Sequence, residues 1–363
     1  MTKKKNLYFY TEKNIYDALH HKRLTSSLLH SMLLKRGIII PSDLDKEVLI
    51  EEICRLPHCY EDLQKIKDLV QTYDKRESTT NAQLNIGITQ LELKNVTESI
   101  KKMYASESES LNINTKADGS ISIELNYQDI DLSRTELRQI DNRTINMDFN
   151  ISSNKINVRM PSNNKAKELL SVIEEKINSY MNVVVERVEI SLEAVTNPSL
   201  RSKFFNELLA NINGYKLVDV TNIELNKIKS HDDEDENEEN INTSFVKRAV
   251  LKGEAVNTSS IFSQLHAKGY YISKISWAAV PVKNNGDQIL LDASFKNIDT
   301  CSDFSYQIRG VNNYKGGKYN ITSRPASEPE KKTISLLIEE SAEKAYNLIL
   351  SEISCEDEEC EES

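Results

Sequence analysis

Residues 110–129 read SLNINTKADGSISIELNYQD, and this stretch decides how the centre of the chain is interpreted. Apolar and polar residues alternate on both sides of Ala117-Asp118-Gly119, which is the period of a half-buried β-strand. Gly119 supplies the positive φ that a tight turn needs. The stretch therefore predicts a β-hairpin in a sheet whose other face carries polar side chains.

The same order of elements appears twice around this hairpin. Residues 77–182 predict a strand, a helix, four strands and a long closing helix, and residues 241–353 predict that order again. A partial strand–helix–strand unit is expected between them, at 183–230. Internal duplication is indicated by three similar strings, LELKNVT (91–97), SLEAVTN (191–197) and KGEAVNT (252–258).

The N-terminal part has a helical period instead. Residues 12–70 predict four amphipathic helices, with Thr25 or Ser26 as one N-cap and Gly37 as a C-terminal stop. The polar residues 74–82 mark the end of this part. We therefore expect an α+β fold, with a helical domain at 1–76 followed by duplicated antiparallel-sheet modules (β-α-β4-α) that carry their helices on one face.

The composition bears on whether the protein is expected to enter a membrane or to be secreted. The chain has 363 residues, of which 39% are apolar, and its apolar runs are short, as in Trp277 to Val282. A membrane-spanning helix needs about 20 apolar residues, and a signal peptide needs about 7–15. Only Leu7 to Tyr10 follow the charged N-terminus as an apolar patch. We expect a cytoplasmic protein with no membrane partner.

The charge is unevenly distributed. The net charge is −10, but residues 231–240 and 352–363 carry seven carboxylates each, so the remainder of the chain is at +4. We expect a disordered acidic loop at 231–240 and an acidic tail at 354–363. Residues 1–36 have a net charge of +6. Because phosphate binding depends on the local electrostatic field and not on the net charge of the chain, this basic segment keeps nucleic acid as a candidate partner. The alternative is that these lysines only keep the terminus soluble.

The second and third predicted helices carry a recognisable pattern. A leucine-rich helix ends in Lys35-Arg36-Gly37 and is followed, after a short linker, by a helix with Lys46, Leu49 and Ile50. This resembles a SAP-type helix–extension–helix DNA-binding motif. The resemblance implies that four residues face phosphates: Lys22, Arg23, Lys35 and Arg36. The alternative is a helical hairpin that docks a protein.

The predicted modules also resemble a known architecture. Their element order is similar to one half of the TATA-box-binding-protein fold, and it also suits helix-grip folds. Alternate strand positions such as Asn112, Asn114 and Gln307 are polar, which favours a nucleic-acid saddle or a protein-docking sheet over an apolar cavity. The further candidate nucleic-acid contacts are Lys116, Arg309, Lys315 and Lys318.

Motifs for catalysis or metal binding are missing from the sequence. Cys54, His58 and Cys59 are spaced like ligands, but they do not close a tetrahedral zinc site, and the five cysteines indicate no disulfide framework. We expect no catalytic residue, metal or cofactor. The absence of catalytic motifs favours a protein that is not an enzyme. The alternative enzyme is a metal-dependent nuclease that gathers Glu92, Asp118 and Glu124.

These observations lead to one functional expectation and one further alternative. Residues 55–70 (RLPHCYEDLQKIKDLV), followed by KREST (75–79), resemble N-terminal regions of bacterial phage-defence accessory proteins. We expect a non-catalytic recognition or sensor subunit that binds DNA or RNA and acts with a separate effector protein. The alternative is a protein–protein scaffold that assembles through its sheets, for example as a homodimer.

Overall fold

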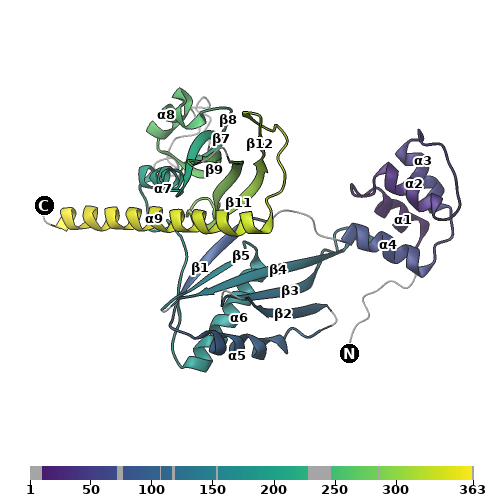
Figure 1. Ribbon diagram of the computed structural model, residues 1–363, viewed down its shortest axis with the longest axis horizontal. Coiled ribbons are helices and arrows are strands. Elements are labelled where there is room, and N and C mark those ends of the chain that lie inside the picture. Colours follow the sequence, from purple (N-terminus) through teal and green to yellow (C-terminus); the bar gives the residue numbers. More distant parts are fainter. Residues whose placement is uncertain are drawn as a thin grey trace, which may run out of the picture. The chain divides into compact units, whose positions relative to one another are not determined.

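The computed structural model describes residues 10–71, 77–106, 108–116, 119–152, 154–227, 247–283 and 286–361, with side chains up to Ile353 (Figure 1). The acidic run 231–240 and the side chains of the acidic tail lie outside the described residues. The chain divides into two compact units. The first contains Met1–Arg76, Thr97–Asn114 and Ile123–Asn146, and the second contains Glu77–Val96, Thr115–Ser122 and Met147–Ser363.

Helices make up the N-terminal part, and the expected α+β fold with a helical N-terminus is confirmed. Thr25 is the N-cap of the second helix, because its hydroxyl accepts a hydrogen bond from the Leu28 amide, and Gly37 follows that helix at φ +77°. The helices are α1 (Glu12–Leu19), α2 (Ser26–Leu34), α3 (Lys46–Cys54) and α4 (Tyr60–Gln71).

The core of this helical bundle includes a residue from the sheet region. Leu137, in the 3-10 turn η1 (Glu136–Arg138), is 1% exposed and belongs to the same apolar cluster as the bundle leucines. Its carbonyl accepts a hydrogen bond of 3.1 Å from Gln71 Nε2. Asn14 Nδ2 donates to Glu136 at 2.8 Å. The helical core therefore extends beyond the predicted boundary at residue 76.

The first module has the predicted strand–helix–four-strand–helix order. Its elements are β1 (Thr79–Asn85), α5 (Gln90–Lys101), β2 (Glu109–Thr115), β3 (Ile121–Ile130), β4 (Ile140–Ile151), β5 (Ile156–Pro161) and α6 (Asn164–Met181). The alternation of apolar and polar residues at 85–93 (NIGITQLEL) predicts the first strand of the module there, and this prediction is wrong. The first strand ends at Asn85, and Gln90 begins α5 because Thr89 and Glu92 cap that helix, with Thr89 N donating to Glu92 Oε2 at 2.8 Å.

The second half of the chain repeats this order with an insertion. Its elements are β6 (Glu186–Val188), α7 (Pro198–Ala210), β7 (Tyr215–Lys227), β8 (Arg248–Lys252), α8 (Ser260–Ala267), β9 (Tyr270–Pro281), β10 (Gln288–Asn297), β11 (Ser302–Asn312) and α9 (Glu328–Glu361). In the second unit the strands pair antiparallel in the order β8-β7-β9-β10-β11-β1-β5. Without β8 and α8, the elements from β6 to α9 repeat the order of the first module, which is one strand, one helix, four strands and a closing helix.

The second copy therefore begins at β6, within the segment that the sequence predicts as a partial unit. The three similar strings do not mark equivalent places in the repeats. Residues 91–97 lie inside α5, whereas 191–197 and 252–258 precede α7 and α8. The pairing of strands, rather than these short strings, defines the repeat.

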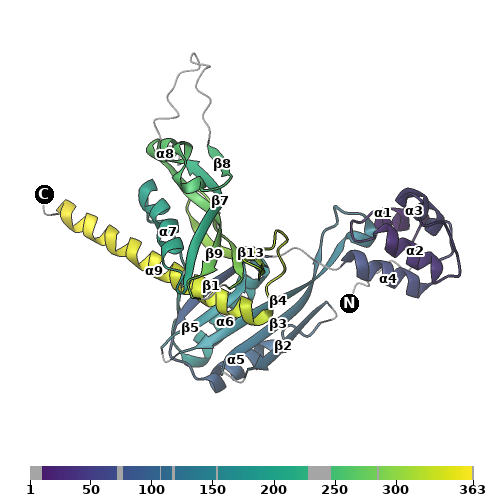
Figure 2. The same cartoon turned by 45° about the horizontal axis from the view of Figure 1, so that its top comes forward.

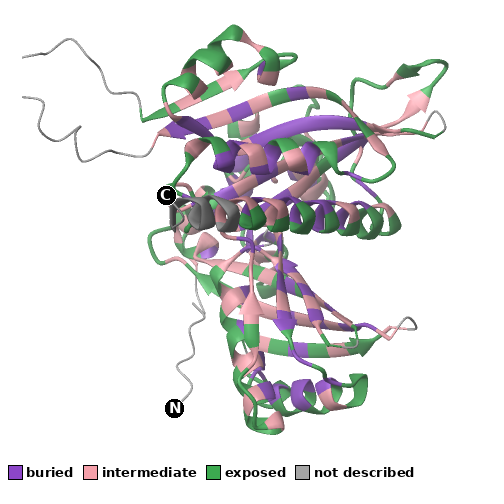
Figure 3. Ribbon diagram, turned by 90° about the vertical axis from the view of Figure 1, so that its left-hand side faces the viewer, coloured by how far each residue is buried: buried purple, intermediate pink, exposed green. Residues whose placement is uncertain are grey.

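The two halves carry their helices on opposite faces of the sheet. Thr79 of β1 pairs with Tyr306 of β11, so these side chains share a face, and Tyr306 lies in the core formed with α7 and α9. Ala82 and Leu84 of β1 alternate onto the other face, where they are buried. In Figures 1 and 2, α6 lies along β1 and β5, and α9 crosses β11. Figure 3 shows the alternation of buried and exposed residues along the strands.

A buried ion pair joins the halves. Arg159 of β5 donates from Nε and NH2 to the two carboxylate oxygens of Glu339 in α9, both at 2.6 Å. Tyr306 Oη donates to Glu339 Oε1 at 2.5 Å. Burial, reinforced by the Glu339 charge, raises the pKa of Tyr306, so the phenol keeps its proton and remains a donor. Each oxygen of Glu339 therefore has a donor.

Replacing Glu339 by Ala is expected to lower the unfolding free energy by about 3–5 kcal/mol, because Arg159 would be left buried without a counter-charge. The matched control is Glu343→Ala, which removes an exposed partner 3.4 Å from Lys155 and should cost less than about 1 kcal/mol. Urea unfolding of the full chain measures both. Equal losses in the two variants would contradict a special role for Glu339.

Candidate nucleic-acid interface

A short palindromic hairpin, NYKGGKYN, occupies residues 313–320 and is called the basic hairpin below. Its strands are β12 (Tyr314–Lys315) and β13 (Lys318–Tyr319), in which Tyr314 pairs with Tyr319 and Lys315 with Lys318. The two central glycines have φ of +57° and +84°, as a type I′ turn requires. The tyrosine rings pack with their centroids 5.1 Å apart.

Arg324 fixes the base of the basic hairpin. Its Nε donates to Asn313 Oδ1 at 2.7 Å, and its NH2 lies 3.0 Å from Asp287 Oδ2 and 2.7 Å from Glu330 Oε1. Asp287 also accepts a hydrogen bond of 2.9 Å from the Tyr314 amide. The hydrogen bonds from Arg324 lower the pKa of Glu330 to about 2. The planar guanidinium therefore ties the hairpin to β10 and α9.

The backbone at this base leaves no room for a side chain. Val311 N donates to Arg324 O at 2.8 Å, and Arg324 N donates back to Val311 O at 2.9 Å. A Cβ atom on Gly310 would lie 2.9 Å from the Arg324 carbonyl oxygen. Glycine at 310 is therefore required for this close approach.

The tip of the basic hairpin carries unneutralised charge. Lys315 and Lys318 are exposed and directly opposite each other, and neither has an ion-pair partner among the described residues. Like charges in a cross-strand pair are destabilising. A polyanion lying across the tip would remove this repulsion, so the fold leaves the charge of these two predicted residues available to a ligand.

The other predicted sheet residues are already paired. Lys116 Nζ lies 2.5 Å from Asp148, and Arg309, although 59% exposed, lies 3.7 Å from Asp292. Another carboxylate on the sheet, Glu224, pairs with both Arg248 and Lys274. These ion pairs reduce the positive field that a phosphate backbone would meet at the sheet.

The four predicted N-terminal contacts separate into two groups. Lys22 and Lys35 are exposed, as phosphate contacts must be. Arg23 donates to the Leu69 carbonyl at 3.2 Å, and Arg36 is bonded to the Pro57 carbonyl and to Asp62. The two arginines therefore hold the bundle together, and the two lysines face solvent.

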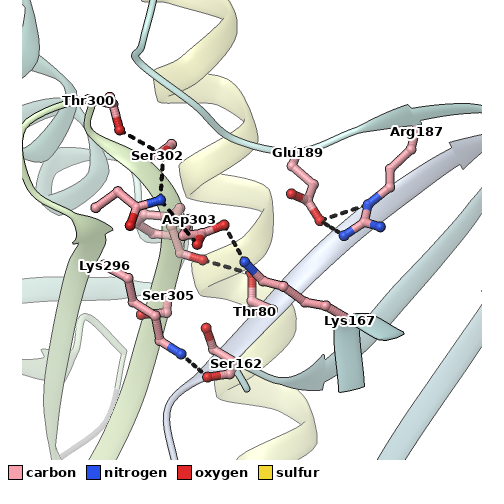
Figure 4. A network of polar contacts seen from close by, with 12 residues as sticks. Thr80, Ser162, Lys167, Arg187, Glu189, Lys296, Thr300, Ser302, Asp303 and Ser305 are labelled. Atoms are coloured by element: carbon pink, nitrogen blue, oxygen red, sulfur yellow. Dashed lines mark hydrogen bonds and ion pairs between the residues drawn. The ribbon is translucent and has the colours of Figure 1, made fainter. Parts of the chain in front are cut away.

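Two further lysines belong to an internal network at the junction of the halves (Figure 4). Lys167 of α6 pairs with Asp303, and Lys296 of β10 donates to the Ser162 carbonyl. Thr80 Oγ1 donates to the Phe304 carbonyl at 2.7 Å. Burial, together with the charge of Lys167, lowers the pKa of Lys296. Both ammonium groups therefore connect β10, β11 and α6 rather than facing a ligand.

The cysteine and histidine residues near α3 have structural partners. Cys54 is buried in α3, and His58 and Cys59 follow Pro57 in the segment between α3 and α4. His58 Nε2 contacts the Ile53 carbonyl at 2.9 Å, and Cys59 Sγ donates to Asp62 at 3.1 Å. Within the described part of the chain, no group of three or more such ligands is placed to hold a metal ion.

The carboxylates of the alternative nuclease site have local roles. Glu92 caps α5, and Glu124 accepts a hydrogen bond of 3.0 Å from Asn126. Asp118 lies outside the described residues. The two described carboxylates therefore serve secondary structure where they lie.

The comparisons with known proteins leave the site to be interpreted from its geometry. No protein-family model matches this chain, and a search of curated proteins finds no match either. Among the described helices, none combines the length and the apolar character that crossing a membrane requires.

Sequence reasoning identified the two lysines but missed what positions them. The sequence pattern predicts two long strands, at 304–312 and 318–325, on either side of Gly316 and Gly317, whereas the second strand has only two residues. Asp287 and Arg324 were not singled out, because their contact requires the fold to bring β10 beside the hairpin. The palindrome NYKGGKYN was the available signal for a self-paired ribbon.

The Glu330–Arg324 contact is expected to weaken in acid. Because the pKa of Glu330 falls from 4.5 to about 2 in the folded state, its contribution to stability is complete above pH 4.5 and is lost as the pH falls toward 2. Unfolding by urea at pH 5.5, 4.5 and 3.5 should show the wild type losing its advantage over Glu330→Gln. The control is Glu328→Gln, a residue whose side chain is 85% exposed. A constant difference between wild type and Glu330→Gln would contradict this assignment.

Proposed function

We propose that this protein is a non-catalytic nucleic-acid-binding subunit and that the basic hairpin contacts the phosphate backbone. The observation that supports this is the pair of opposed lysines, Lys315 and Lys318, held on a fixed base without neutralising carboxylates. In this proposal the chemistry belongs to a separate effector protein. A role in bacterial phage defence remains a prediction from the sequence resemblance.

The shape of the basic hairpin suits this contact. A two-stranded ribbon fits the major groove of duplex DNA, and lysine binds phosphate as a mobile point charge. Tyr314 and Tyr319 lie next to the lysines and are half-buried, so their rings add aromatic surface beside the backbone contact. The clamp at Arg324 lowers the ordering cost, because the ribbon is positioned before binding.

The N-terminal bundle adds a smaller contribution. Lys22 and Lys35 retain the role that the SAP-like resemblance implies, whereas Arg23 and Arg36 do not, because their guanidinium groups bond within the bundle. The contact is therefore expected to be electrostatic and largely independent of base sequence, since phosphate contacts position a protein without reading bases.

The double variant Lys315→Ala/Lys318→Ala is expected to weaken binding to duplex DNA of any sequence. Each lost phosphate contact should reduce the slope of log K against log salt by about 0.9, so the double variant should show a slope shallower by about 2. Fluorescence anisotropy at three salt concentrations measures this, with duplex RNA and single strands as further probes.

The matched control removes the same charge elsewhere. Lys101→Ala/Lys102→Ala replaces two exposed lysines at the end of α5 and should leave the slope unchanged. Both double variants should unfold at the wild-type temperature, because surface substitutions of this kind cost within about 0.5 kcal/mol. If the hairpin variant keeps the wild-type affinity and slope, the proposal is wrong.

A further inference from the structure

The helical bundle contains an apolar groove that overlaps the proposed nucleic-acid contacts at Lys35. It has a volume of about 400 Å³ and runs between α2 and α4, with the end of α3 below it. Leu28 and Met32 line one side and Leu69 lines the other, and all three are only half-buried. This volume lies in the usual range for binding pockets, about 300–1,000 Å³.

The spacing of the lining residues matches a helical partner. Leu28, Met32 and Lys35 lie one turn apart along α2, and Asp62, Lys65 and Leu69 do so along α4. Each wall therefore extends for about two turns, or about 10 Å. Two helices that leave an apolar groove of this kind between them offer the position of a further helix, whose axis would lie about 8–10 Å from each wall.

One end of the groove is held by fixed polar contacts. Arg36 pairs with Asp62, and its NH2 lies 3.3 Å from His58 Nδ1. Burial lowers the pKa of His58, so the neutral ring accepts from Arg36 while its Nε2–H donates to the Ile53 carbonyl. These contacts neutralise Arg36 and Asp62 and fix both side chains at this end of the groove.

The remaining rim carries two lysines and one carboxylate, Asp68, which already has an interaction partner of its own. Lys35 and Lys65 are exposed on opposite walls, and neither has an ion-pair partner among the described residues. Arg36 and Asp62 cancel each other. The groove therefore combines an apolar floor with a lysine on each wall, which is complementary to an amphipathic helix whose apolar stripe is flanked by carboxylates.

We propose that this groove docks an acidic amphipathic α-helix of a partner protein. Leucine-type side chains at i, i+4 and i+7 of that helix fill the space over Met32 and Leu69, and glutamates on either side of the stripe meet Lys35 and Lys65. The docking surface shares no residue with the basic hairpin, and Lys35 is its overlap with the proposed nucleic-acid contacts, so the hairpin variant tests the two interactions separately.

The test uses a helix-stapled peptide of about 14 residues, with leucines at i, i+4 and i+7 and flanking glutamates. The full chain is labelled at the methyl groups of its six methionines. The Met32 methyl signal, assigned by Met32→Leu, should shift saturably, and the signal of exposed Met103 should not. A peptide with lysines in place of the glutamates should bind about tenfold more weakly.

Charge reversal gives a test that does not depend on the apolar floor. Lys35→Glu/Lys65→Glu should invert the preference, so that the lysine-flanked peptide binds more tightly, while Lys101→Glu/Lys102→Glu should change nothing. An unshifted Met32 signal, or equal binding of both peptides, would overturn the proposal. A self-associating chain whose Met32 signal depends on protein concentration would instead assign the groove to a second copy. Lys315→Ala/Lys318→Ala should bind the peptide normally, which separates this result from nucleic-acid binding.

Discussion

The contact of Arg159 and Tyr306 with Glu339 is the constraint on which the second unit depends. The backbones of β1 and β11 pair at Thr79 and Tyr306, so side-chain contacts such as those to Glu339 must hold the rest of this junction between the halves. A buried carboxylate is tolerated only when all its donors are in place, and this permits one register of β11 against β1 and one position of α9. The N-terminus of α9 carries Glu330, so this position also sets the clamp on the basic hairpin.

The opposite placement of helices in the two halves bears on where the two proposed binding surfaces lie. Each half leaves one sheet face without helices, and the charges described there are paired, as in Lys116 with Asp148 and Lys274 with Glu224. Because the opposite charges of these ion pairs largely cancel, they leave only a weak positive electrostatic field to attract a polyanion. The exposed lysines that the two proposals use lie away from these faces, at the tip of the basic hairpin and on the rim of the bundle groove.

Local signals predicted much of the fold, and long-range contacts explain what they missed. Thr25 and Gly37 bound α2 because caps act within one turn, and the hydrophobic period identified α6 and β9. The first strand is predicted too far along the chain because the exposed face of β1 is polar and only Thr80, Ala82 and Leu84 are buried. The sequence predicts the two lysines of the basic hairpin from their residue type. It does not predict the groups that position them, because Asp287, Arg324 and Glu330 come from separate parts of the fold. No local pattern shows that Leu137 enters the helical core.

Arginine and lysine have different roles here, and the difference follows from their chemistry. Arg36, Arg159 and Arg324 each bond several acceptors at once, because the planar guanidinium presents donors in a fixed fork. Lysine has a compact, strongly hydrated charge on a flexible stem, so it gains less from a rigid internal contact. In the bundle and at the hairpin, arginine fixes the geometry and the neighbouring lysines face solvent. A count of basic residues therefore overestimates the positive charge available to a ligand, because Arg36, Arg159 and Arg324 already bond within the fold.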